Sequence, residues 1–238
     1  MNWEQIYDIR FIESPGCWET CSSYCCSNFH ADKMPLLSSK GVVLPLFPGE
    51  WDHQRSLGVE ERPGFEHRED VYTLADGTQW HQHFLYCQCD GQCGPHEARP
   101  LICRIYPYFP IVDLNGSVLD FEYSSLMDLC YTDPERDHPC TLVREHAEET
   151  KRSLAEGMSF IKESPELIFS FQVIHLLTET FKKAMGMTMG ESEDQRKFFK
   201  KFEWMVFSRK AWTKADFIEG VERIYTDVRN QHGSLELN

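Results

Sequence analysis

The chain has 238 residues, 41% of them hydrophobic, and a formal net charge of −14. That length is sufficient for one large domain with its own core, while the negative charge disfavours binding to nucleic acid or to anionic membranes, because both carry phosphates. No apolar run is long enough to span a bilayer, and residues 1–8 have neither the basic nor the apolar region of a secretory signal. We therefore expect a cytoplasmic protein with no nucleic-acid or membrane partner.

The first regular elements are predicted between residues 42 and 70. Residues 42–46 predict an edge strand, because Pro45 cannot donate a hydrogen bond to a neighbouring strand. Residues 48–57 predict a short helix that ends at Gly58. The charged segment 59–70 contains a Pro-Gly pair, which favours a loop.

Two β-hairpins are predicted next. The first pairs residues 71–74 with residues 78–85 and turns at Asp76-Gly77. The second spans residues 111–123 and turns at Asn115-Gly116. Asp-Gly and Asn-Gly between apolar runs are among the strongest short-range hairpin signals, because both central positions of the turn favour positive φ.

From about residue 141 the pattern becomes helical. Residues 141–161 have mixed charge and helical spacing, and Ser164-Pro165-Glu166 predicts the start of a long helix with proline at its first position. Residues 192–195 match a capping box for a third helix. A fourth helix is predicted from Thr213 to about Gly233. Together these elements predict an α+β fold, in which a small, irregular β and cysteine-cluster domain with hairpins (1–140) packs against a helical block (141–238).

The predicted third helix mixes lysines with aromatic residues. Such a mixture can bind nucleic acid by stacking, but it is also typical of an amphipathic helix that buries its aromatic side chains and exposes its lysines. The net charge favours the second interpretation. The residues concerned are Lys197, Lys200, Lys201, Phe198, Phe199, Phe202, Trp204 and Phe207.

Ten cysteines are the most informative feature of the composition. In a reducing compartment they favour metal binding or redox chemistry over disulfides. A disulfide framework in a chain without its signal peptide, and isolated buried thiols, remain alternatives. Turn-forming dipeptides, Asp90-Gly91 and Gly94-Pro95, interrupt the second of two dense groups, so several sulfurs can point to one centre. The predicted metal ligands are Cys17, Cys21, Cys25, Cys26, Cys87, Cys89, Cys93 and Cys103.

Neighbouring side chains could extend this centre. His81 and His83 share one face of a predicted strand and could donate two imidazoles, or they could line a solvent-facing sheet edge. Cys130 and Cys140 are either further ligands or small buried apolar residues.

Two arginines flank Cys103. Arg99 and Arg104 could offset the negative charge of a thiolate-bound centre, so we expect them to contact the cofactor. The alternative is that both form surface ion pairs.

The cysteine spacing resembles a known family. The residues that carry the resemblance are Cys17, Cys21, Cys25-Cys26, Phe84-Leu85, Cys93 and the run Arg99-Pro100-Leu101-Ile102-Cys103-Arg104-Ile105-Tyr106-Pro107. On these residues the chain is similar to the YkgJ-type cysteine-cluster proteins, described as zinc- or iron-chelating or iron–sulfur proteins. The family commonly has a cysteine where this chain has Gln82, and Cys87 and Cys89 are the candidates to replace it. The resemblance covers roughly residues 15–130.

The resemblance also implies an enzymatic alternative. A distant branch of the family, the flagellin lysine N-methylases, uses S-adenosylmethionine and modifies a protein substrate. The sequence has no G-x-G motif after a strand, so no Rossmann-type methyltransferase site is predicted. Methyl transfer therefore rests on the resemblance alone.

Spacing does not identify the metal. The chain lacks the two C-x2-C knuckles of zinc ribbons and the C-x3-C-x2-C pattern of radical-SAM enzymes. We expect an iron–sulfur cluster, of the 4Fe–4S type, or iron rather than zinc, because the candidate ligands outnumber one tetrahedral site. The centre could serve a redox or protein-modifying enzyme, or a zinc-stabilised interaction or metal-delivery module that contacts a partner protein. A Cys–His catalytic pair is the weaker alternative.

Overall fold

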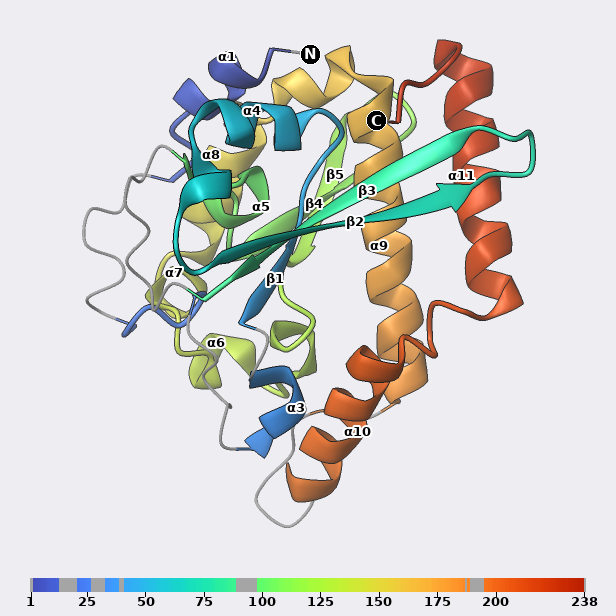
Figure 1. The fold of residues 1–238 in the computed structure, drawn as a ribbon. Helices are drawn as coiled ribbons and strands as arrows, with labels where there is room; N and C mark the ends of the chain where they lie inside the picture. The colour runs from blue at the N-terminus through green and yellow to red at the C-terminus, as the bar shows by residue number, and fades with distance from the viewer. Residues whose placement is uncertain are drawn as a thin grey trace.

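The computed structural model describes residues 2–12, 21–26, 33–38, 41–88, 98–186, 188 and 195–237. It has an α+β fold in which two small antiparallel sheets pack with a helical C-terminal block (Figure 1), as predicted. The N-terminal half contains α1 (Trp3–Asp8), α3 (Pro35–Ser38), β1 (Val42–Pro45), α4 (Glu50–Ser56), the 3₁₀ turn η2 (Val59–Glu61), β2 (Phe65–Thr73), β3 (Gln79–Cys87), α5 (Leu101–Arg104), β4 (Tyr108–Val112) and β5 (Val118–Tyr123). The remainder contains η4 (Asp128–Cys130), α6 (Pro134–Asp137), α7 (Thr141–Arg144), α8 (Ala147–Gly157), η5 (Ser159–Glu163), α9 (Pro165–Met185), α10 (Gln195–Ser208) and α11 (Ala215–His232).

The first sheet has the strand order β1-β3-β2, and the second is the β4-β5 hairpin. β1 is an edge strand, as Pro45 predicted. The Asn115-Gly116 hairpin is also confirmed, and Gly116 adopts φ 72°. A Cβ atom at Gly116 would approach Lys162 Cα to 2.9 Å, so this turn requires glycine both for its dihedral angle and for its close contact with η5.

The prediction of a loop over residues 59–70 is wrong from Phe65 onwards, where a strand begins after the short 3₁₀ turn η2 and the turn at residues 62–64. β2 begins at Phe65, six residues before the predicted start, and pairs with β3 along its whole length. The segment is rich in charge because most of β2 faces solvent at the edge of the sheet. Charged residues on an edge strand also protect it from pairing with other chains, so charge alone did not distinguish a loop from a strand.

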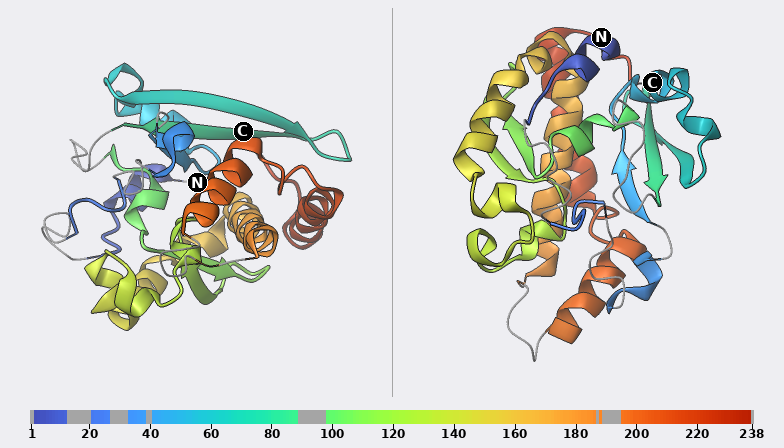
Figure 2. Two further views of the ribbon diagram at one scale, coloured as in Figure 1. Left: turned by 90° about the horizontal axis from the view of Figure 1, so that it is seen from below. Right: turned by 90° about the vertical axis from the view of Figure 1, so that its left-hand side faces the viewer.

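Helix α9 lies between the two sheets (Figure 2). Its start is the predicted one, because the Ser164 side chain accepts a hydrogen bond from Leu167 N. On one side, Phe169 packs edge-to-face against Trp80 of β3, with ring centroids 5.3 Å apart. On the other side, Phe171 meets Phe109 of β4 at 4.9 Å.

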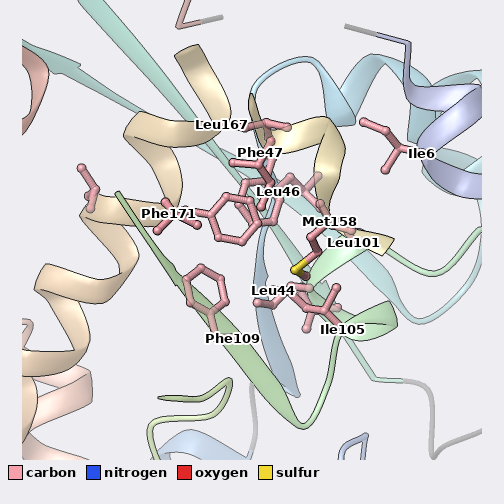
Figure 3. Close-up of a cluster of buried hydrophobic side chains, with 14 of the residues drawn as sticks. Ile6, Leu44, Leu46, Phe47, Leu101, Ile105, Phe109, Met158, Leu167 and Phe171 are labelled. Carbon is pink, nitrogen blue, oxygen red and sulfur yellow. The ribbon is translucent and has the colours of Figure 1, made fainter. Parts of the chain in front are cut away.

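The main hydrophobic core surrounds these contacts (Figure 3) and takes residues from both halves of the chain. It packs α5 against β1 through Leu44, Leu101 and Ile105, which are all buried. Burying a side chain of this size contributes about 1.5–3 kcal/mol. The core therefore fixes the position of the segment that carries Cys103.

Residues 233–237 run alongside the first sheet. β1 pairs only with residues 84–87 of β3. Beyond that point, His81 N donates a hydrogen bond of 2.7 Å to Leu237 O. Leu235 and Leu237 are both buried, so this segment covers part of the β3 edge that β1 leaves open.

Helix α10 is amphipathic: it buries Phe198, Phe199 and Phe202 and exposes its three lysines, but Trp204 and Phe207 are exposed, so only part of its aromatic set is buried as expected. Its predicted capping box at residues 192–195 falls mostly outside the described residues. Helix α11 extends from Ala215 to His232, close to the predicted bounds. None of the helices within the described ranges is both long and apolar enough to cross a membrane.

Candidate metal centre

Four cysteines line one pocket of the molecule. Cys25 and Cys26 come from a turn segment, Cys87 from the end of β3, and Cys103 from α5. The same pocket is lined by the apolar residues Val42, Leu44, Phe65, Ala98 and Pro100 and by the arginines Arg62 and Arg99. We call this the thiol-lined pocket. The structure thus brings together half of the eight predicted ligands.

The turn that carries Cys25 and Cys26 is held by a buried tyrosine. Residues 21–26 form consecutive turns, with positive φ at Ser22 and Ser23, so the four-residue cysteine spacing does not lie on a helix here. Tyr24 lies between these serines and Cys25 in the sequence. Its hydroxyl donates a 2.7 Å hydrogen bond to Asp128 Oδ1. Tyr106 donates to the other oxygen of the same buried carboxylate at 2.8 Å. Asp128 therefore joins the cysteine turn to the segment after β5.

Cys87 is positioned by both neighbours of β3. Its Cα partners are Val42 in β1 and Phe65 in β2, which both line the pocket. Gly41, the residue just before β1, has φ 71°, and a Cβ atom there would lie 2.3 Å from the Cys87 carbonyl oxygen. Only glycine lets β1 begin this close to the cysteine.

A buried carboxylate that the sequence analysis did not single out supports Cys103. Glu50, fully buried at the start of α4, accepts hydrogen bonds from Leu101 N at 2.6 Å, Phe47 N at 2.9 Å and Tyr7 Oη at 2.7 Å. Burial raises the pKa of Glu50 above its usual range, against the lowering effect of these hydrogen bonds. Leu101 is the first residue of the four-residue helix that contains Cys103, so Glu50 joins this helix to α1 and α4. Nothing in the sequence indicated this role for Glu50. Its position after Pro48-Gly49 indicated only that a helix starts there.

The two arginines beside Cys103 have different environments. Arg99 lines the pocket and donates from Nη2 to Cys103 O at 2.9 Å, while its buried Nε has no hydrogen-bond partner among the described residues. Arg104 instead donates to Arg99 O and Tyr7 O, and its guanidinium lies 4.3 Å from the centre of the Tyr7 ring. Arg62, which was not predicted, also lines the pocket.

Six cysteines remain, and of these the predicted ligand Cys21 is partly exposed and is not among the residues that line the pocket. Cys140 is buried, and its pKa is raised to about 12, chiefly by burial, with further contributions from nearby Cys21 and Cys25. Cys130 packs in a separate apolar cluster with Phe181 and Phe198, and its Sγ lies 3.5 Å from Leu126 O. The predicted ligands that lie outside the described residues are Cys17, Cys89 and Cys93. None of the seven cysteines in the described ranges forms a disulfide with another.

The two histidines considered as further ligands make other contacts. His81 Nδ1 contacts Glu69 on β2, and His83 Nδ1 lies 3.0 Å from His67 Nε2, also on β2. The His67 ring in turn stacks on Trp51 at 3.8 Å. Neither His81 nor His83 lines the thiol-lined pocket.

The donor chemistry of the pocket fits a metal. Cys25 Sγ and Cys26 Sγ lie 3.6 Å apart, and two thiolates on one tetrahedral zinc, each at a Zn–S distance of about 2.3 Å, would be about 3.8 Å apart. Two guanidinium groups at the pocket would offset the negative charge of such a centre. Thiolates in this pocket could thus hold a zinc or iron ion.

Comparison with known proteins found no matching family model, curated protein or solved structure. The similarity to the YkgJ-type proteins thus remains a prediction carried by the residues quoted above.

Proposed function

We propose that this protein binds a metal centre through the thiolates of Cys25, Cys26, Cys87 and Cys103. The observation that supports the proposal most directly is that these four thiols, from three segments far apart in the sequence, line one pocket. Four thiolates are the usual ligand set of a structural zinc site and also that of an iron–sulfur cluster. When bound, the metal would cross-link the turn at residues 21–26, the end of β3 and α5.

The separation of Cys25 Sγ and Cys26 Sγ favours one metal atom that takes both of these ligands. In a 4Fe–4S cluster each iron takes a single protein thiolate, so two adjacent ligands would have to move apart. A cavity of about 20 Å³ at the pocket has room for a single water-sized group. A mononuclear iron or zinc centre is therefore our first assignment.

An iron–sulfur cluster is the second candidate. Cys140 lies close enough to both Cys21 and Cys25 to interact with them electrostatically, so the thiols gathered in this part of the molecule outnumber one tetrahedral site. A cluster could use Cys21 in place of one member of the adjacent pair.

Anaerobic purification with quantification of iron, zinc and acid-labile sulfide separates these candidates. Stoichiometric zinc, or iron without sulfide, would support a mononuclear centre. Iron and sulfide in comparable amounts, with visible absorption, would support the cluster. Protein that retains no metal, and takes up neither zinc nor iron after anaerobic reduction, would refute the proposal.

Cysteine variants test the location of the centre. Cys103→Ala should lose the bound metal, because it removes one of four ligands from the pocket. The matched control is Cys130→Ala, which removes a thiol from the separate apolar cluster and should keep the metal although it lowers stability. Equal metal content in the two variants would mean that the metal is not bound in the thiol-lined pocket.

A further inference from the structure

A second cluster of metal-ligating side chains lies between β5 and α9. Glu122 belongs to β5, and His175 and Glu179 belong to α9. Each offers one ligand atom, and these atoms lie within 4.8 Å of one another. We call these three residues the carboxylate–imidazole cluster. None of them was among the predicted ligands.

Regular secondary structure positions all three side chains. His175 and Glu179 are four residues apart on a 21-residue helix, so they share one face. Glu122 is held opposite Phe109 in the β4-β5 pairing. Because Phe109 also packs against Phe171 on α9, strand and helix are held together close to the cluster.

Glu122 has an unsatisfied oxygen. Its side chain is only 7% exposed. Oε1 lies 3.1 Å from His175 Nδ1, but the buried Oε2 has no hydrogen-bond partner among the described residues. A buried carboxylate oxygen without a partner is costly, and a bound cation would compensate it.

We propose that the carboxylate–imidazole cluster binds a divalent first-row transition metal ion. One imidazole and two carboxylates suit manganese, iron or zinc, whereas calcium takes oxygen ligands. The side chains of His175 and Glu179 are 34% and 50% exposed, so the ion can enter from solvent. Three protein ligands also leave coordination positions for water or a small ligand.

Manganese is the suitable probe, because it prefers oxygen and nitrogen ligands and binds thiolates poorly. Mn²⁺ is titrated into the protein as purified, and the free ion is followed by electron paramagnetic resonance. The expected result is saturable binding of one ion. Pulsed measurements on the bound ion should show coupling to an imidazole nitrogen, and this coupling should disappear in His175→Gln.

Two variants remove carboxylate ligands without removing side-chain volume. Glu122→Gln and Glu179→Gln should each weaken Mn²⁺ binding about tenfold or more. The matched control, Glu156→Gln, changes an exposed carboxylate on α8 and should bind Mn²⁺ like the unmodified protein. Since Glu179 is half exposed, its variant remains informative even if Glu122→Gln impairs folding, which circular dichroism would reveal.

The proposal is overturned if no saturable Mn²⁺ binding occurs well above the protein concentration. It is equally overturned if Glu179→Gln binds as tightly as the control, or if the imidazole coupling persists in His175→Gln. Because the proposal does not depend on the thiols, its failure would leave the assignment of the thiol-lined pocket unaffected.

Discussion

The thiol-lined pocket takes its donors from a turn, a strand end and a one-turn helix, whereas the carboxylate–imidazole cluster takes its donors from within β5 and α9. Donors in irregular segments depend on separate supporting contacts, such as those of Asp128 with Tyr24 and of Glu50 with Leu101. Donors within regular elements are placed by the backbone geometry itself. The two sites should therefore respond to different substitutions, and four experiments can test this contrast.

The largest expected effect is that a variant of the thiol-lined pocket loses its metal while the carboxylate–imidazole cluster keeps its own. Cys87→Ala should abolish retention of iron or zinc by the thiol-lined pocket, because Cys87 is one of four thiols there, and should leave Mn²⁺ binding by the other cluster unchanged. Elemental analysis and the Mn²⁺ titration on the same preparation check both outcomes. Loss of both metals in a folded variant would mean that the sites are not independent.

Removal of the Glu50 carboxylate should come next in size. In Glu50→Ala, Leu101 N, Phe47 N and Tyr7 Oη lose their buried acceptor, so we expect a loss of unfolding free energy of about 3 kcal/mol or more. Urea unfolding measures this loss. Glu50→Gln retains one acceptor oxygen and should lose less. If Glu50→Ala were as stable as Glu50→Gln, these hydrogen bonds would not be what holds α5.

Thiol reactivity should distinguish the pocket from the other buried cysteines. Burial raises the pKa of Cys130 to about 12, and only the thiolate reacts readily. After metal removal, alkylation at pH 8 should therefore modify the partly exposed Cys103 and leave the buried Cys130 largely unmodified, because few Cys130 thiols are deprotonated at that pH. Mass spectrometry of peptides locates the label. Labelling of Cys130 as fast as Cys103 would contradict this assignment.

The smallest effect concerns a lysine that competes for the second site. Lys182 Nζ lies 2.7 Å from Glu179 Oε1 in an exposed pair three residues apart on α9. Exposed pairs of this kind contribute about 0.3–0.5 kcal/mol, so Lys182→Ala should tighten Mn²⁺ binding about twofold. Lys151→Ala, which breaks an equivalent pair with Glu148 on α8, should not change it. A weaker affinity in Lys182→Ala would mean that the lysine helps to hold Glu179 in place.

Local signals in the sequence predicted much of the fold. The Asn115-Gly116 turn and the Ser164 cap depend on a few neighbouring residues, and both were predicted correctly. The start of β2 was missed because its exposed, charged residues resemble those of a loop. Whether a charged segment is a strand depends on a partner strand, and pairing with β3 is not visible within the segment itself.

The sites were predictable only in part. Cysteine density identified Cys25, Cys26, Cys87 and Cys103 as candidates, but which thiols share a pocket depends on how the segments pack. The role of Glu50 depends on contacts with distant segments in the same way. The spacing of His175 and Glu179 can be read from the sequence, whereas their meeting with Glu122 follows from the packing of β5 on α9.

The hydrogen bond from His81 to Leu237 has a consequence for how the chain acquires its structure. All three strands of the first sheet lie within residues 42–87, but the part of the β3 edge that β1 leaves open is covered only when residue 237 has been synthesised. Contacts between such distant positions form slowly, and open strand edges are sites of unwanted pairing. The nascent chain would therefore carry an open strand edge for most of its synthesis, and the last residues would be needed to close it.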